Sequence, residues 1–379
     1  MLFIMLFSRN FSKKNSANGF NKMTENSFSP SAWFEQLFGF RERVADVAKN
    51  IKCEEVGDDA FLVSLVNGKR YKAGNFQVRS ISSFDMKPRG GGKLHIIHGH
   101  GSYSTHFDYI DVLSNQALPE NDGATYLAAS NFNCLEFVSQ DQTALDGVTG
   151  YVYDRTQGPF CALAAGPAIV YRNYFVKHDG KVGQLEKEIE LLKKTPIHVT
   201  HGYPIITNPE FTNNSSNKKF KWDDENNYLV GVHRGCQLTT TRNGNNFALV
   251  NQDDRIVHHV YAAAFNFNGT VDKCNLTIKI SKYMLKAEYK AAILAAWENS
   301  LLYPNRKGSN KLYLTLLGGG VFGNDIDLIA DAIGSNINII KDSGLDVYVV
   351  CFSDSLFTEV NHVLGKHVKS TKGSIIDAY

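Results

Sequence analysis

The sequence has little of what marks several common classes of protein. Its 40 basic and 38 acidic residues leave a net charge of only +2, which gives no basis for a nucleic-acid or membrane partner. Its six cysteines stand singly without a CxxC pair, so neither a disulfide framework nor a cysteine metal site is predicted. No apolar run is long enough to cross a bilayer. With 379 residues, 43% of them hydrophobic, the chain is predicted to be a soluble cytoplasmic protein with a sizeable core.

The best-known phosphate-binding fingerprint is also missing, because the chain has no GxxxxGK[ST] sequence. A glycine run, LLGGGVFGN, stands between the uncharged segment Leu312–Leu317 and the segment Asp327–Ile340, whose apolar residues have helical spacing. Val347–Phe352 is a second apolar run. The pattern predicts strand, glycine loop, helix and strand. Ligands bind at the carboxyl ends of strands in such folds, and free amide groups there attract phosphate. A plain tight turn is the alternative.

The amino-terminal part is expected to differ from the rest. Residues 1–28 are expected to be a disordered or targeting extension, and Met1–Lys22, which has no acidic residue, makes mitochondrial targeting an alternative to the cytoplasm. A helix over Trp33–Lys49 and a hairpin turning at Asn67–Gly68 would form a subdomain over residues 29–92. The remainder, 93–379, would be the catalytic domain.

A second polar segment follows the predicted buried strand Tyr126–Ala129. Ser130, Asn131 and Asn133 come directly after it, and asparagine side chains both donate and accept hydrogen bonds, as recognition of ribose hydroxyls requires. A cap and turn at a strand-to-helix junction is the alternative. Farther along, Arg155 and Arg172 are candidate phosphate contacts, with core packing as the alternative.

Four histidines lie between residues 94 and 106: His95, His98, His100 and His106. Their spacing fits no helical zinc pair, and no cysteine lies nearby. We therefore assign no metal and no cofactor, and keep a metal-dependent enzyme as an alternative.

The rest of the chain alternates loosely between strands and helices. Helices are predicted at Gln184–Leu192 and Lys282–Leu302, and strands within Tyr228–Thr241 and Ile256–Phe267. This alternation predicts an α/β fold with a mixed sheet.

Four blocks in order resemble the atypical macrodomains of the MavL type: SNFNCLEF, DRTQGPFCALAAGPAIVYRNYF, VGVHRGCQLTTT and LTLLGGGVFGNDIDLIADAI. The resemblance implies a three-layer α/β/α macrodomain-like domain with ADP-ribose, the ligand and product, across the carboxyl edge of a mixed sheet. Members of that group remove ADP-ribose from arginine side chains, including arginine on ubiquitin. The implied partner is an ADP-ribosylated protein, with ubiquitin as one candidate.

The resemblance also implies residue roles. Asn131 and Asn133 would face the distal ribose. Backbone amides of the glycine loop would hold the diphosphate, over Gly318, Gly319, Gly320, Val321, Phe322, Gly323 and Asn324.

The catalytic candidates are acidic. Asp325 would orient the attacking water, Asp327 would contact the substrate guanidinium, and Glu136 could exchange roles with either. The QEE signature of poly(ADP-ribose) glycohydrolases is absent after the triple glycine. Either aspartate could instead cap the following helix, and a reader that binds ADP-ribose without turnover is the alternative function.

Overall fold

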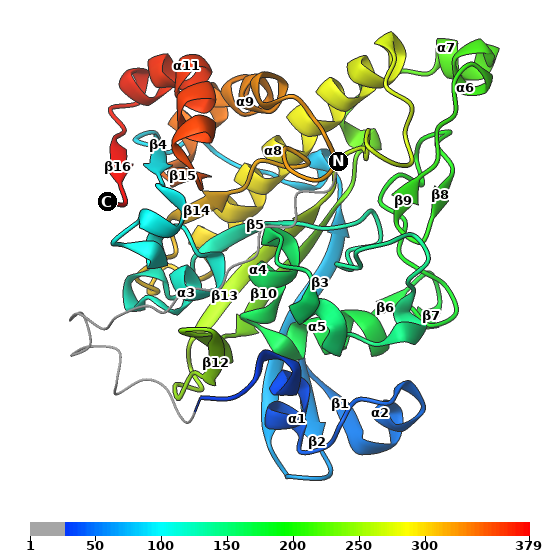
Figure 1. Ribbon diagram of the computed structural model, residues 1–379, viewed down its shortest axis with the longest axis vertical. Helices are drawn as coiled ribbons and strands as arrows, with labels where there is room; N and C mark the ends of the chain where they lie inside the picture. The colour runs from blue at the N-terminus through cyan, green and yellow to red at the C-terminus, as the bar shows by residue number, and fades with distance from the viewer. Residues whose placement is uncertain (1–26) are drawn as a thin grey trace.

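A computed structural model describes residues 27–379. Its centre is a ten-stranded mixed sheet in the order β1-β2-β3-β10-β13-β5-β14-β15-β4-β16 (Figure 1). The extension expected over residues 1–28 lies almost wholly outside the described residues. At its end, the Phe28 amide donates a 2.9 Å hydrogen bond to the Phe247 carbonyl.

The strands of the main sheet are β1 (Ile51–Val56), β2 (Asp59–Ser64), β3 (Arg70–Arg79), β4 (Lys93–His98), β5 (Thr125–Ala129), β10 (Val230–Gln237), β13 (Ile256–Ala262), β14 (Lys311–Leu314), β15 (Asp346–Cys351) and β16 (Ile375–Asp377). Three separate two-stranded ribbons are β6 (Lys177–His178) with β7 (Lys181–Val182), β8 (Val199–Thr200) with β9 (Tyr203–Pro204), and β11 (Thr240–Asn243) with β12 (Asn246–Leu249). The α-helices are α1 (Trp33–Phe38), α2 (Val44–Asn50), α3 (Val112–Ala117), α4 (Gln157–Leu163), α5 (Gly166–Tyr174), α6 (Glu210–Asn213), α7 (Ser215–Lys219), α8 (Asn275–Leu302), α9 (Ile326–Gly334), α10 (Ile337–Ser343) and α11 (Asp354–Ser370). None of the helices within residues 27–379 combines the length and apolar content needed to cross a membrane.

The strand directions divide the sheet into two parts. Strands β13, β5, β14, β15, β4 and β16 are parallel to their neighbours, whereas β1, β2, β3 and β10 are joined by antiparallel pairings. Strand β10 pairs with β13 in antiparallel fashion. The carboxyl ends of the parallel strands therefore meet at one edge of the sheet, which is where ligand sites form in such folds.

Helices cover both faces of the sheet. Helices α8, α10 and α11 pack on one face, joined by α9, and α4 and α5 pack on the other (Figure 1). The side chains alternate accordingly: Leu312 and Leu314 of β14 belong to the apolar cluster under α8, and Tyr313 between them belongs to the cluster on the opposite face. The three-layer α/β/α class predicted from the sequence is confirmed.

A ladder of rings crosses four of the parallel strands. Tyr126 of β5, Tyr313 of β14, Tyr348 of β15 and His95 of β4 are register partners. Their successive ring centroids are 4.8, 4.9 and 4.8 Å apart, with interplanar angles of 7°, 15° and 18°. Because a one-residue slip would turn a ring to the opposite face, the ladder favours a single register.

Two predicted helices are interrupted. The helix expected over Trp33–Lys49 breaks at Gly39, whose φ of +79° is left-handed, so that α1 and α2 are separate. The helix expected over Asp327–Ile340 breaks after Gly334, where the Asn336 side chain donates to the carbonyls of Lys286 and Ala332 at 3.0 Å each.

The predicted helix at Gln184–Leu192 is wrong. Its amides bond to distant groups instead of to carbonyls one turn back: Gln184 N–H donates to the Asn173 carbonyl and Leu191 N–H to the Phe132 carbonyl. The predicted hairpin is present as β2 and β3, but β3 pairs with β10, so residues 29–92 continue the main sheet instead of forming a separate layer.

Candidate functional site

Three loops meet at the carboxyl edge of the parallel strands. They follow β13, β5 and β14 and cover residues 263–274, 130–137 and 315–325. Phe267 N–H donates to the Phe322 carbonyl at 2.9 Å, and the Asn268 side-chain amide donates to the Val321 carbonyl at 2.9 Å. Ser130 N–H donates to the Ala262 carbonyl at 2.9 Å. The loops therefore form one connected surface.

The glycine loop after β14 is held in shape by Asn324. The Asn324 amide N–H donates to the Gly318 carbonyl at 3.0 Å, and its side chain donates to the Phe265 carbonyl at 2.8 Å. Its side-chain oxygen accepts from the Ser281 hydroxyl at 3.1 Å. Gly318 has φ of +70°, and a Cβ there would collide with Asn324. Asn324, expected to contact diphosphate, thus uses its buried side chain to shape the loop.

Several loop amides have no hydrogen-bond partner among the described residues. Gly319 N–H donates to the Leu316 carbonyl at 3.1 Å, which uses up one donor of the triple glycine. Within residues 27–379, no hydrogen bond uses the N–H groups of Gly320, Val321 or Phe322. A Cβ added at Gly320 would meet no atom within 4 Å, so the space beside it is open. Three consecutive donors, close to the start of α9, are therefore available to an anion.

Two carboxylates stand at the beginning of α9. Asp325 occupies the N-cap position, but its side chain makes no capping hydrogen bond. It instead lies 3.0 Å from the Lys273 Nζ, with 61% of its side chain exposed. Asp327 in the first turn is exposed and has no hydrogen-bond or ion-pair partner among the described residues. The interpretation of Asp325 as a helix cap is therefore wrong.

Helix α8 holds the start of the glycine loop through the hydroxyl of Tyr289. The Tyr289 hydroxyl donates to the Thr315 carbonyl at 2.8 Å and accepts from the Leu317 amide at 2.9 Å. The preceding residue, Glu288, is fully buried, and neither of its oxygens has a hydrogen-bond partner in the part of the chain described. Burial raises the pKa of Glu288 well above its ordinary value, and the Ala263 backbone offsets this only in part. Burial beneath the site thus favours the protonated form of Glu288.

The asparagine loop after β5 is also tightly organised. Asn131 donates to the Phe137 carbonyl at 2.7 Å and is buried. Asn133 is fully buried; it donates to Glu188 at 2.9 Å and accepts from the Leu135 amide at 3.1 Å. Asn133 therefore holds the loop through buried hydrogen bonds, whereas Asn131 shares the Phe137 carbonyl with the Tyr203 hydroxyl.

Tyr203 joins the asparagine and glycine loops. Its hydroxyl donates to the Phe137 carbonyl at 2.8 Å, and its ring centroid lies 6.1 Å from that of Phe322. The two loops that the sequence pattern predicted to be neighbours therefore adjoin.

Glu136 lies in the core, away from the open amides. Its side chain and that of Arg172 have no solvent exposure, and Arg172 Nη2 lies 3.0 Å from Glu136 Oε2. Arg172 also donates from Nε to the Cys134 carbonyl at 2.9 Å. Burial raises the pKa of Glu136 to about 7, although Arg172 acts to lower it. Arg172 therefore holds the asparagine loop, and the idea that it contacts a ligand phosphate is wrong for this conformation.

Sequence reasoning missed Lys273, Asn268 and Tyr203. The first two belong to the loop after β13, which contains the segment FNFNGT. The polar residues Asn266 and Asn268, a few residues after a buried strand, were the available signal. Tyr203 comes from the β8–β9 ribbon, and nothing local indicated that this ribbon reaches the sheet edge.

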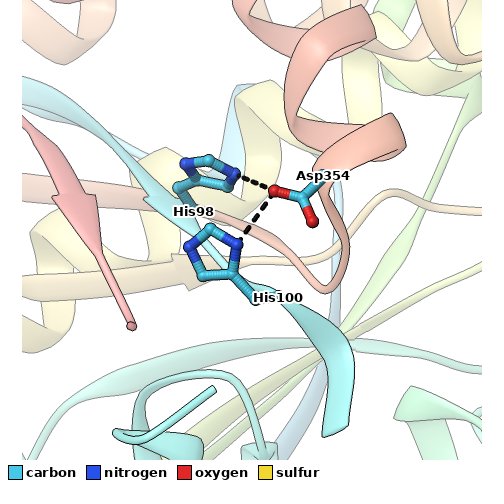
Figure 2. A group of neighbouring side chains, drawn as sticks. All are labelled: His98, His100 and Asp354. Carbon is cyan, nitrogen blue, oxygen red and sulfur yellow. Dashed lines mark hydrogen bonds and ion pairs between the residues drawn. The ribbon is translucent and has the colours of Figure 1, made fainter. Parts of the chain in front are cut away.

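The four histidines separate in the structure. His95 belongs to the ring ladder and lies 3.3 Å from Asp346, and His106 is exposed and stacks on Tyr109. His98 and His100 come together at the end of β4 beside Asp354 (Figure 2).

Comparison with known proteins finds structural likeness but no sequence relative. No protein-family model and no curated protein matches the chain. Among solved structures, a poly(ADP-ribose) glycohydrolase from Thermomonospora curvata has 11% identity and a TM-score of 0.42, covering 90% of this chain and 98% of its own. A mutant of the Deinococcus radiodurans enzyme with ADP-ribose has 10% identity and a TM-score of 0.41, covering 77% of this chain and 94% of its own.

An Oceanobacillus iheyensis macrodomain with MES bound has 16% identity and a TM-score of 0.22, covering 31% of this chain and 56% of its own. Since these TM-scores are all below 0.5, the likeness transfers no activity or substrate to this chain. Any functional assignment has to come from the chain's own residues.

Proposed function

We propose that the carboxyl edge of the sheet binds ADP-ribose and that the chain hydrolyses the bond between ADP-ribose and an arginine side chain of a protein. The observation that carries the proposal is the combination of unpaired amides at Gly320, Val321 and Phe322 with two exposed carboxylates, Asp325 and Asp327, at the start of the next helix. Amides alone would suit any phosphate. Added carboxylates suit a ligand that joins a diphosphate to a cationic group.

The proposed binding follows from charge. The diphosphate accepts hydrogen bonds from the three unpaired amides and is favoured by the amino end of α9. Lys273, 3.0 Å from Asp325, offsets the negative charge that this aspartate would otherwise place beside a phosphate. The distal ribose extends from there toward Asn131, because Tyr203 brings the asparagine loop against Phe322.

The proposed chemistry needs a carboxylate at each side of the scissile bond. Positive charge develops on the ribose as the bond from C1″ to the guanidine nitrogen breaks. Asp325 orients a water and accepts its proton while the water oxygen bonds to C1″. That proton passes to the leaving guanidine, so the products are ADP-ribose and a guanidinium. The Asp327 carboxylate accepts hydrogen bonds from the planar N–H groups of the guanidinium. Glu136 acts from the core as a positioning residue through Arg172.

A reader without turnover is the second candidate, and one observation favours it. Asp325 is ion-paired with Lys273 and Glu136 with Arg172, so Asp327 is the one acidic candidate of the three without a counter-ion in the described part of the chain. Such a site would bind ADP-ribose, but Asp325, the proposed general base, would be held in an ion pair with Lys273.

The test uses the full chain with proteins that carry ADP-ribose on arginine, serine or glutamate, with ubiquitin modified on arginine as one substrate. Free ADP-ribose is measured over time, and ADP-ribose binding is measured by calorimetry. Release from arginine alone supports the hydrolase. Binding without release from any substrate supports the reader. Absence of both overturns the proposal.

A further inference from the structure

A second cluster of side chains lies on the same edge of the sheet, two strands from the glycine loop. Figure 2 shows His98 and His100 at the end of β4 pointing toward Asp354, the first residue of α11. His98 Nε2 lies 2.8 Å from Asp354 Oδ1, and His100 Nδ1 lies 2.9 Å from the same oxygen. One ligand atom from each of the three residues falls within 4.8 Å of the others.

A fourth residue orients the cluster. His100 Nε2 lies 2.7 Å from Oδ1 of Asp377, at the end of β16. The His98 ring stacks on Phe357 with centroids 3.8 Å apart and an interplanar angle of 11°. The two imidazoles are 17% and 15% exposed, whereas Asp354 is 70% exposed. The rings are thus held in place while the carboxylate faces solvent.

A neutral His100 ring has too few N–H groups for its two carboxylate neighbours. A neutral imidazole carries one N–H, yet both ring nitrogens of His100 lie within 2.9 Å of a carboxylate oxygen. If His100 Nε2–H donates to Asp377, its Nδ1 presents a lone pair to Asp354. A cation between Nδ1 and Asp354 removes that conflict. The remaining His100–Asp377 contact is then the carboxylate–histidine pair that commonly supports a metal ligand.

We propose that His98, His100 and Asp354 bind a divalent transition metal, zinc first, with Asp377 orienting His100. Two imidazoles and one carboxylate are a ligand set that zinc prefers, and three protein ligands leave an open position for water or another ligand. Tetrahedral ligands about 2.0–2.2 Å from zinc lie roughly 3.3 Å from each other. The two histidine–Asp354 separations must therefore widen by about 0.5 Å, which the exposed Asp354 side chain can accommodate.

The proposed metal would join three segments that are far apart in sequence. It would connect β4 to the start of α11 directly and to β16 through Asp377. It would lie two strands from β14, or about 10 Å along the sheet edge. The site is therefore separate from the proposed ADP-ribose amides, and failure of either proposal leaves the other standing.

The experiment is metal binding to the full chain after treatment with a chelator. Zinc is counted after dialysis, and Co²⁺ is added as a spectroscopic probe whose visible absorption reports tetrahedral coordination. We expect one metal per chain and a rise in thermal unfolding temperature with added zinc. Asp354→Asn, which keeps the size and one acceptor oxygen, should weaken binding at least tenfold. Asp377→Asn should weaken it about tenfold, as changes of supporting carboxylates do.

The matched control is His106→Ala, because His106 is exposed and stacks only on Tyr109. It should bind zinc as the unchanged chain does. The proposal is overturned if the unchanged chain binds no more zinc than the His98→Ala/His100→Ala double variant. It is also overturned if Asp354→Asn folds and keeps full affinity, or if His106→Ala loses binding equally. In each of these cases the cluster would be a hydrogen-bonded network of histidines and aspartates without a metal.

Discussion

Arg172 Nη2 lies 3.0 Å from Glu136 Oε2, and both side chains are completely buried. Arg172 Nη1 also donates to the Tyr261 hydroxyl at 2.5 Å, and Arg172 Nε donates to the Cys134 carbonyl in the asparagine loop. The pair therefore connects the core beneath β13 with a loop of the candidate site. Its loss should change the position of that loop as well as the stability of the chain.

We expect Arg172→Met to destabilise the chain by about 3–5 kcal/mol, because Glu136 would remain buried without its counter-ion. Glu136→Gln should also destabilise the chain strongly, because the Arg172 guanidinium cannot lose its charge and would stay buried without a carboxylate. Urea unfolding followed by circular dichroism measures both. Arg155→Met, at an exposed arginine, is the control and should be neutral. A Glu136→Gln variant with unchanged stability and no turnover would instead place Glu136 in the chemistry.

The two exposed aspartates should separate binding from turnover. Asp325→Asn and Asp327→Asn should each lower release of ADP-ribose from modified arginine by about 100-fold or more, the usual range for loss of general acid–base catalysis. Both should keep ADP-ribose affinity within about threefold, because the diphosphate is held by amides and not by carboxylates. Single-turnover release and calorimetry provide the two measurements. Full turnover in both variants would remove these residues from the mechanism.

Gly320 tests whether the loop amides contact a ligand. A Cβ added there meets no atom within 4 Å, and the backbone is not left-handed, so Gly320→Leu should leave the unfolding temperature unchanged. It should lower ADP-ribose affinity about tenfold or more, because loss of one hydrogen bond to a charged group costs about 1.5–3 kcal/mol.

The matched control for this substitution is Gly150→Leu. Gly150 is also exposed and also has open space around an added Cβ, but it lies outside the three loops. Equal affinity for ADP-ribose in the Gly320 and Gly150 variants would show that the diphosphate does not approach this part of the loop.

Glu288 should make stability depend on pH. Its pKa in the folded chain is raised above the ordinary 4.5 by burial, so the folded state binds more protons than the unfolded state above that pH. The free energy of unfolding should therefore fall as pH rises from about 4.5 toward the folded pKa, by about 1.4 kcal/mol per pH unit. Glu288→Gln should remove that dependence. Urea unfolding of the unchanged chain and of Glu288→Gln, between about pH 5 and about pH 7, measures the difference in how the free energy of unfolding depends on pH. If the two free energies changed with pH in parallel, the pKa of Glu288 would not be raised in the folded chain.

The sequence was sufficient to predict the sheet edge and its central loops. Apolar runs and glycines are local signals, so β5, β14, β15 and the position of the glycine loop could be predicted from them. The hydrogen-bond partners of individual polar side chains could not be predicted in this way. Asn133 and Asn324 bond inside the protein, and their partners Glu188, Phe265 and Ser281 are 43 or more residues away in sequence.

Long-range pairing explains the remaining differences. The amides of Gln184 and Leu191 bond to Asn173 and Phe132, and these tertiary bonds replaced the predicted helix. His98 and His100 gained Asp354 and Asp377 only because β15 and β16 flank β4. The segment of residues 94–106 contains no carboxylate, so its sequence alone could not indicate this cluster.

The ring ladder has a consequence for how the site could change. Tyr126, Tyr313, Tyr348 and His95 fix the strands to one another within the sheet, before any loop begins. The spacing between neighbouring strand ends therefore does not depend on loop composition. Such a platform tolerates exchange of the loop residues that choose a ligand, so new specificities could arise there without refolding the scaffold.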